Sequence, residues 1–412
     1  MKLNKSLLGW ISYDFANSSF TTVIVTVVYS VYFKKVVVGQ EEYGTSLWGI
    51  AISISMLIVA ISSPVLGAIA DYSHSKKKFL FIYCYSAVVF TGLLYFVRSG
   101  HILSGMLFFI IANIGFEGGN VFYNAFLPEI AKEKDIGKVS GLGWGIGYLG
   151  GLLSLLLVYP FAESKTILVF PIIALFYGIF AIPTFVFVSE KKLIGKYATN
   201  YIKQGYNRIK STFQHLNKFK ELGKFLIAFF IYNDGIKTVI VFSAIYGAKT
   251  FDMNVNQLII YFVLAQTSSF IGAIVFGYTM DKIGAKNTIS LTLLIWLAVV
   301  IWAFFCPNIK QFYGIGLLAG LAMGSSQSSS RSMLSLLTPK NKQAEFFGFY
   351  AFTGKASAIL GPFIYGQIAF FSGNQRFAIL SIAFFFILGL TVLQFVNETE
   401  GRELARCVGR NA

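Results

Sequence analysis

An aspartate stands inside the first long apolar run of this chain. Residues 10–33 read WISYDFANSSFTTVIVTVVYSVYF, and their first two turns carry Asp14 and Asn17. The run is long enough to cross a bilayer, where a carboxylate is costly unless it faces protein or a water-filled cavity. We therefore expect Asp14 and Asn17 to line a cavity, although Asp14 could instead cap the start of the helix.

A second polar group lies in a later apolar run. Glu117, Asn120 and Asn124 are spaced i, i+3 and i+7, so a helix would carry all three on one face. Glu117 could carry a proton or bind the ammonium group of a substrate, or it could form an ion pair with Arg331. The two glycines that follow Glu117 predict a close helix contact or a bend at this point.

The second half of the chain places further charges in apolar runs. Asp234 and Lys237 are spaced i, i+3, so they could pair along one helix or face a cavity. Arg331 could bind a substrate carboxylate, act in a gate, or extend toward the cytoplasmic surface. Lys355 lies in the middle of its run and needs a carboxylate from the protein or from a substrate. Gln327 is a further candidate substrate ligand.

The composition indicates an integral membrane protein. Of 412 residues, 56% are hydrophobic and 13% are charged, and the mean hydropathy is +0.67. The three cysteines, Cys84, Cys306 and Cys407, show no metal-binding or redox spacing, and we expect no metal and no cofactor. The positively charged residues that give the net charge of +16 lie mostly between apolar runs, so we expect no nucleic-acid partner.

Apolar runs of membrane-spanning length recur about twelve times, which predicts an all-α membrane protein with twelve transmembrane helices. We expect the spans near residues 8–33, 47–70, 79–98, 104–128, 141–161, 167–189, 223–247, 256–279, 288–306, 312–336, 345–370 and 376–396. Most Lys and Arg residues fall on the segments that share a side with the N-terminus, which predicts that both termini are cytoplasmic.

The two halves of the chain share a loop pattern. Gly67 and Asp71 lie near the end of the second span, and Gly277 and Asp281 lie near the end of the eighth, at a constant offset. A carboxylate at the edge of the membrane can accept hydrogen bonds from the N-terminus of a neighbouring helix. An internal repeat of six spans is typical of secondary transporters, in which the substrate binds between the two halves.

The repeat predicts four parts of the chain. Residues 1–189 form an N-terminal six-helix bundle, and residues 223–396 form a C-terminal one. Residues 190–222 form a basic cytoplasmic linker, which could be an amphipathic helix on the membrane or a solvated tether. Residues 397–412 form a cytoplasmic tail.

Several motifs resemble those of a known family. The G-x-x-x-D-x-x-x-x-K loops at Gly67–Lys76 and Gly277–Lys286 are similar to the signature loop of the major facilitator superfamily. The sequences YDFANS at Tyr13–Ser18, SRS at Ser330–Ser332 and AEFFGFYAFTGK at Ala344–Lys355 resemble one branch of it. That branch contains the yeast vacuolar amino-acid effluxer of autophagy and its bacterial relatives, and the resemblance covers essentially the whole chain.

The resemblance implies the major facilitator fold, two six-helix bundles in which spans 1, 4, 7 and 10 line a central cavity. All the charged residues singled out inside the membrane, except Lys355, fall on those four spans. It also implies that Asp71 and Asp281 are gating residues, which lock the cytoplasmic side in the outward-open state. Because the branch has many bacterial members, we expect the bacterial inner membrane as the location.

Together these features predict a secondary active transporter, not an enzyme, because no catalytic groups cluster at one membrane surface. We expect proton-coupled alternating access for a small polar or zwitterionic metabolite, with amino acids as the first candidates. The expected partners are the substrate, protons and membrane lipids, and we expect a monomer. Two alternatives are an exporter of amphipathic compounds or lipids, which the 43 Phe and 22 Tyr residues would suit, and a non-transporting membrane receptor.

Overall fold

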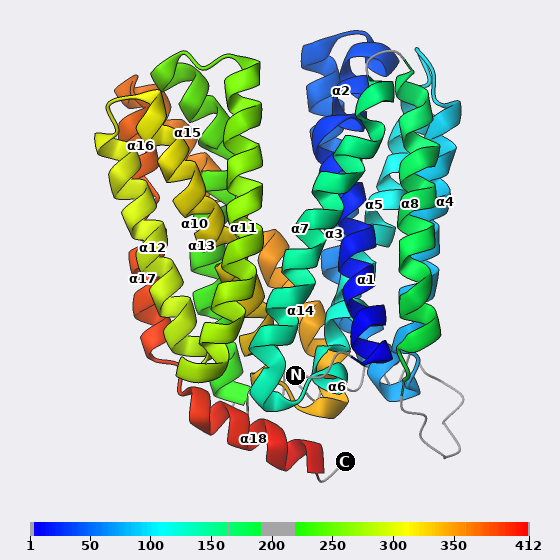
Figure 1. Cartoon of the computed structure of the whole chain (residues 1–412), viewed down its shortest axis with the longest axis vertical. Helices are drawn as coiled ribbons and strands as arrows, with labels where there is room; N and C mark the ends of the chain where they lie inside the picture. Colours follow the sequence, from blue (N-terminus) through cyan, green and yellow to red (C-terminus); the bar gives the residue numbers. More distant parts are fainter. Residues whose placement is uncertain (1–3, 163–164, 191–218, 359, 411–412) are drawn as a thin grey trace. The chain divides into compact units, whose positions relative to one another are not determined.

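The computed structural model describes residues 4–162, 165–190, 219–358 and 360–410, and all regular structure in these residues is helical (Figure 1). The chain forms two compact units. Most of the predicted basic linker lies outside the described residues. The predicted division at residues 189 and 223 stays a prediction, whereas the predicted tail contains a helix, α18 (Glu398–Arg410).

Unit 1 comprises Met1–Ile130, Ile146–Lys210 and Lys342–Ala351. Its helices are α1 (Lys5–Ser19), α2 (Tyr29–Tyr32), α3 (Glu41–Ser73), α4 (Lys76–Leu93), α5 (Ile102–Ala125), α6 (Leu127–Ile130), the later part of α7 (Ile136–Ala162), and α8 (Thr166–Phe187). One π-helical stretch, η1 (Phe20–Val27), joins α1 to α2, and a second, η2 (Phe33–Val38), continues the helix beyond α2. The N–H of Val28 accordingly donates to the carbonyl of Val23 at 2.7 Å, the i→i−5 bond of a π-turn.

Unit 2 comprises Ala131–Gly145, Ser211–Asn341 and Phe352–Ala412. Its helices are α10 (Lys220–Phe251), α11 (Val255–Ile283), α12 (Ala285–Phe305), α13 (Ile309–Leu337), α15 (Leu360–Ser372), α16 (Gln375–Ser381), α17 (Ala383–Gln394) and α18. Helix α14 (Gln343–Ala356) begins in unit 1 and ends in unit 2, and α7 begins in unit 2 and ends in unit 1. Short 3-10 turns, η3 (Leu94–Phe96), η4 (Glu133–Asp135) and η6 (Lys340–Lys342), complete the elements of the described residues.

Asparagine is the N-cap residue of several of these helices. The side chains of Asn4, Asn308 and Asn374 each accept a backbone N–H of the first turn of α1, α13 and α16. Asn254 does the same for α11, and Gln257 returns a hydrogen bond to its backbone, which completes a capping box. These caps satisfy N–H groups that have no partner within the helix.

The internal repeat extends to the packing of the helices. In unit 1, α1 packs on α8, α4 packs on α5 and α8, and α3 packs on α5. In unit 2, α10 packs on α17, α12 packs on α13 and α17, and α11 packs on α13, which are the same pairs by chain order. Large aromatic side chains are fully buried in both cores, among them Trp10, Tyr13 and Tyr123 in unit 1 and Tyr232 and Trp296 in unit 2.

The prediction of twelve spans is confirmed only in part. Ten helical stretches of the described residues are long and apolar enough to cross a membrane. The predicted span at residues 312–336 corresponds to α13, whose apolar run is interrupted by GSSQSSSRS at residues 324–332. The predicted span at residues 345–370 is not continuous, because α14 ends at Ala356 and α15 begins at Leu360.

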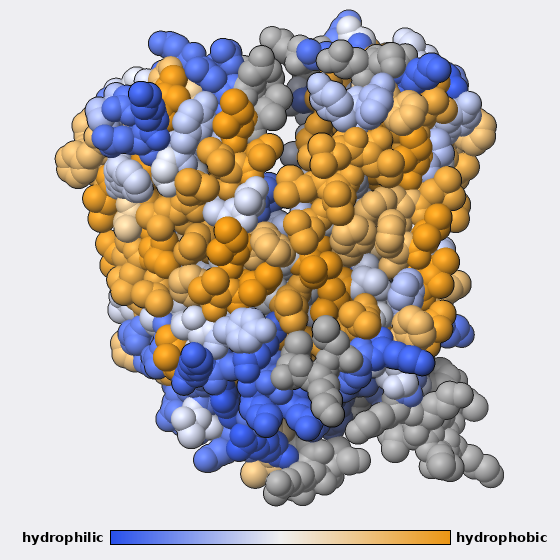
Figure 2. Space-filling view, viewed as in Figure 1, coloured by the Kyte–Doolittle hydropathy of each residue, from blue (hydrophilic) through white to orange (hydrophobic). Residues whose placement is uncertain are grey.

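The surface of the helices suits a lipid environment. On the face seen in Figure 2, apolar side chains cover the middle of the helices and hydrophilic side chains gather toward their ends. Leu57, Ile61 and Leu156 are 61%, 64% and 70% exposed. Exposed apolar side chains in these numbers are energetically favourable in contact with lipid acyl chains and unfavourable in contact with water.

Candidate functional site

Asp14 lies in the middle of α1 within a buried polar cluster of unit 1. The hydroxyl of Tyr123 on α5 donates to the Asp14 carboxylate at 2.7 Å, and Asp14 is only 7% exposed. The indole N–H of Trp10 donates to the backbone carbonyl of Tyr123 at 3.0 Å, which holds α1 against α5 at this point. The alternative that Asp14 caps the helix is wrong, because α1 begins at Lys5 with Asn4 as its cap.

Asn17 links α1 to the polar face of α5. Its side-chain amide donates to the carbonyl oxygen of the Asn120 side chain at 2.8 Å. Glu117 and Asn124 lie on α5 and, like Asn120, are half-buried. The glycine at 118 permits close packing here, since a Cβ at Gly118 would lie 2.4 Å from the ring of Tyr83 on α4.

Asp234 on α10 is completely buried in unit 2 and binds the backbone of α15. Both oxygens of its carboxylate accept the N–H of Gly361, at 2.9 and 3.0 Å. Lys237, one turn further along α10, and Lys355, in the last turn of α14, are both half-buried. Gln327 on α13 is half-buried as well.

Arg331 on α13 is buried and binds the beginning of α7 within unit 2. Its Nε donates to Ser140 Oγ at 2.9 Å, and its Nη2 donates to the Ser140 carbonyl at 2.6 Å. The guanidinium carbon lies 5.3 Å from the ring centroid of Trp144, in a cation–π contact. Because Arg331 is only 2% exposed, the alternative that it extends to the aqueous surface is wrong.

The two aspartates of the repeated loops make equivalent contacts, one in each unit. In unit 1, Asp71 at the end of α3 accepts the N–H of Glu345 in the first turn of α14 at 2.9 Å. In unit 2, Asp281 at the end of α11 accepts the N–H groups of Gly137 and Lys138 in the first turn of α7, at 2.9 and 3.2 Å. Each carboxylate thus satisfies N–H groups at a helix N-terminus, where the helix dipole favours negative charge.

Glycines hold these helix beginnings close to their neighbours. A Cβ at Gly67 on α3 would lie 2.2 Å from the carbonyl oxygen of Ala344, and one at Gly141 on α7 would lie 2.2 Å from that of Ala273. Both distances are far below van der Waals contact, so each backbone approaches its neighbour more closely than any residue with a side chain allows. The Asp71 and Asp281 contacts therefore depend on a glycine one helical turn away, Gly67 before Asp71 on α3 and Gly141 after Gly137 on α7.

Comparisons with known proteins identify the family. The sequence profile of the family described as "Vacuole effluxer Atg22 like" matches residues 36–406. The uncharacterised MFS-type transporter YxiO of Bacillus subtilis is 31% identical over 420 residues, which cover 98% of this chain and 98% of that protein. The chain belongs to the Atg22-like family of the major facilitator superfamily.

Other relatives agree with this assignment. Autophagy-related protein 22 of Kluyveromyces lactis is 25% identical over 408 residues, which cover 90% of this chain and 82% of that protein. The crystal structure of the human organic anion transporter MFSD10 shares the fold, with a TM-score of 0.74 at 13% identity, over 95% of this chain and 98% of that one. The family resemblance inferred from the sequence motifs is confirmed, and this Atg22-like chain is a multi-pass membrane transporter and not an enzyme.

The structure of this Atg22-like transporter also reveals two carboxylates at helix N-termini that the sequence motifs did not single out. Glu190, just after α8, accepts the N–H groups of Lys76 and Lys77 at 2.7 and 3.0 Å, and burial raises the pKa of its carboxyl above the usual value. Glu398, just after α17, accepts those of Ala285 and Lys286 at 3.1 and 2.8 Å. The sequence contains a second repeated motif that could have indicated both residues, FVSE at 187–190 and FVNE at 395–398.

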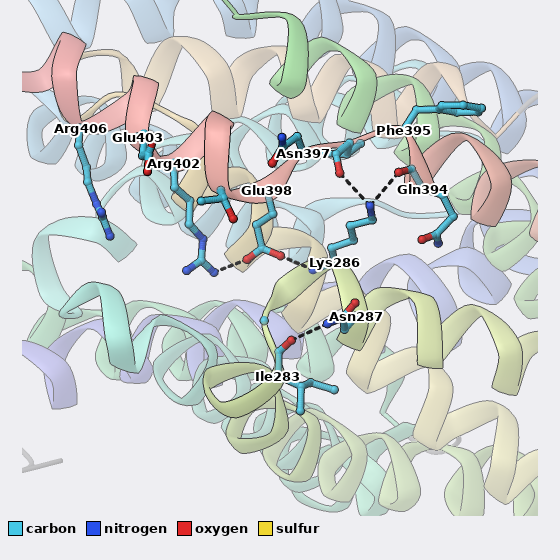
Figure 3. A pocket seen from close by; sticks show the side chains of 13 residues that line it. Ile283, Lys286, Asn287, Gln394, Phe395, Asn397, Glu398, Arg402, Glu403 and Arg406 are labelled. Carbon is cyan, nitrogen blue, oxygen red and sulfur yellow. Dashed lines mark hydrogen bonds and ion pairs between the residues drawn. The ribbon is translucent and has the colours of Figure 1, made fainter.

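The Glu398 cap stands beside a surface cleft of about 700 Å³ in unit 2. Figure 3 shows the Lys286 ammonium donating to the carbonyls of Gln394 and Val396, at 2.7 and 2.9 Å, while Arg402 pairs with Glu398. Lys77, which like Lys286 is the second residue of its helix, donates to a carbonyl of the segment after α8 in unit 1 in the same way. These contacts join the ends of α12 and α17 firmly, so we regard the cleft as part of the scaffold of unit 2.

Proposed function

We propose that this Atg22-like transporter moves a small polar or zwitterionic metabolite, with amino acids as the first candidates, by proton-coupled alternating access. The observation that carries the proposal is the set of buried ionisable and amide groups inside apolar helices of both units. Asp14 and Asn17 on α1 and the Glu117 face of α5 belong to unit 1. Such groups are costly in a membrane and are retained where they bind substrate or carry protons.

The charges suit a zwitterion. The residues that we propose for binding substrate or protons are Asp14, Asn17, Glu117, Asn120 and Asn124 in unit 1 and Asp234, Lys237, Gln327, Arg331 and Lys355 in unit 2. Within this set, Asp14 and Glu117 are candidates for binding an ammonium group or a proton, and Lys355 is a candidate for binding a carboxylate. Because Arg331 already donates to Ser140, we propose that it holds α7 against α13 and acts on the gate.

We propose that the Asp71 and Asp281 contacts form and break during the transport cycle. Each aspartate holds the first turn of a helix that continues into the other unit, α14 for Asp71 and α7 for Asp281. The first turn of each helix is bound within one unit, and the rest of the same helix belongs to the other unit. Forming or breaking the contact at the first turn can therefore be coupled to the conformation of both units. The location we propose is a bacterial inner membrane with both termini cytoplasmic.

Uptake and counterflow in liposomes test the proposal. The purified chain is reconstituted with an inward proton gradient, and the accumulation of a panel of radiolabelled amino acids is measured. We expect at least one amino acid to accumulate only when the gradient is present, and the same compound to stabilise the protein against heat. Binding without any uptake or counterflow would instead indicate a receptor, and accumulation of amphipathic compounds alone would indicate the exporter.

A further inference from the structure

The predicted eleventh span, at residues 345–370, is interrupted near its middle. Helix α14 ends at Ala356, and α15 begins at Leu360. An interruption leaves carbonyl groups at the end of one helix and N–H groups at the start of the next without helical partners. Inside a membrane such groups must find partners within the protein, because no water is present to replace them.

Two adjacent residues of α10 supply these partners, one for each side of the interruption. The side-chain amide of Asn233 donates to Ser357 Oγ at 2.7 Å and to the carbonyl of Gly354 at 3.4 Å, at the end of α14. The carboxylate of Asp234 accepts the N–H of Gly361 with both oxygens, in the first turn of α15. One dipeptide therefore holds both ends of the broken helix.

The close approach at Gly361 shows that this contact is built into the fold. A Cβ at Gly361 would lie 2.1 Å from Thr238 Oγ1 and 2.8 Å from Asp234 Oδ1, so only glycine fits there. The carboxylate of Asp234 lies at the N-terminus of α15, where the positive end of the helix dipole stabilises negative charge. Asp234 is 0% exposed, so its carboxylate is not in contact with solvent.

We propose that Asn233 and Asp234 are positioning residues, which fix the last turn of α14 and thereby place Lys355 for its substrate. The proposal rests on the function proposed above, and it moves Asp234 from the group that binds substrate or protons to the group that orients another residue. Lys355 lies one residue after Gly354, whose carbonyl Asn233 holds. Interrupted helices place ligand-binding groups at half-helix ends in other transporters.

Hydrogen exchange measured by mass spectrometry tests the structural part without any substrate. Wild type is compared with Asp234→Ala, Asp234→Asn and a control, Val241→Ala, on the same helix, where Val241 is 58% exposed. In Asp234→Ala we expect the amide of Gly361 to exchange at least tenfold faster. Asp234→Asn keeps an oxygen that accepts this N–H, so it should stay near the wild-type rate, as should the control. Equal rates in wild type and Asp234→Ala would overturn the proposal.

Transport measurements then separate positioning from proton carriage. We expect Asp234→Ala and Asn233→Ala to raise KM about tenfold with a smaller change in Vmax. Asp234→Asn keeps an acceptor for the Gly361 N–H, so it should raise KM less than Asp234→Ala does. If Asp234 acts through Lys355, its alanine variant should add little to the KM of Lys355→Gln. Loss of accumulation but not of counterflow in Asp234→Asn would identify Asp234 as a proton carrier and refute the proposal. A wild type that transports nothing would refute the proposed function, and hydrogen exchange would still decide the role of the pair.

Discussion

Replacing Gly141 by alanine should release the beginning of α7 from α11. The added Cβ would lie 2.2 Å from the carbonyl oxygen of Ala273, so the two backbones must separate by about 1 Å to reach ordinary contact. The hydrogen bonds from Gly137 and Lys138 to Asp281, now 2.9 and 3.2 Å long, would then exceed hydrogen-bond distance. Because the acceptor is a charged group, each bond contributes about 1.5 kcal/mol or more.

The loss of both bonds amounts to about 3 kcal/mol, which is a factor of about 10² in an equilibrium constant. Hydrogen exchange of the purified protein measures this directly, because local opening exposes the amides of Gly137 and Lys138. We expect these two amides to exchange about 10²-fold faster in Gly141→Ala than in wild type. Gly223→Ala on α10 is the matched control, since a Cβ there meets nothing within 4 Å. Wild-type exchange at both amides in Gly141→Ala would show that glycine is not needed for the contact, and our reasoning would be wrong.

Three further variants test other contacts. Arg331→Lys keeps the charge but loses the two-point contact with Ser140, so the free energy of unfolding should fall by about 2 kcal/mol; an unchanged melting temperature in detergent would contradict this. Asp281→Asn still offers one acceptor oxygen, so the exchange of the first α7 amides should rise about tenfold, less than in Gly141→Ala, and an equal or larger rise would count against the geometry. The carboxyl of Glu190 has a raised pKa in the folded state, so protonation stabilises the folded protein. The stability of wild type relative to Glu190→Gln should therefore increase as the pH falls through that pKa, and it should level off below the pKa of the unfolded state. Thermal unfolding from pH 8 to pH 4 that shows no such trend would exclude the effect of burial.

Part of this molecule follows from sequence patterns alone. The apolar runs predicted the helices because about 20 apolar residues suffice to cross a bilayer. The offset between Asp71 and Asp281 predicted equivalent contacts with neighbouring helices, because a carboxylate at a membrane edge favours a helix N-terminus. The structure shows those contacts with Glu345 and Gly137.

Other features needed the folded chain. The spacing of Asp234 and Lys237 allowed a pair along one helix, but nothing in that spacing shows that Asp234 binds the backbone of α15. No local pattern in residues 345–370 shows that residues 124 and 127 positions away stabilise the interruption between α14 and α15. Contacts of this kind depend on which helices become neighbours, and local sequence patterns do not carry that information.

Proton movement during transport tests the central claim most directly. A pH-sensitive dye inside liposomes reports whether protons enter when the identified substrate is added to wild type, Asp14→Asn and Glu117→Gln. We predict substrate-dependent proton entry in wild type, and in at least one variant counterflow that continues without proton entry. Substrate accumulation in wild type without proton movement, or unchanged proton entry in both variants, would contradict the assignment of these carboxylates.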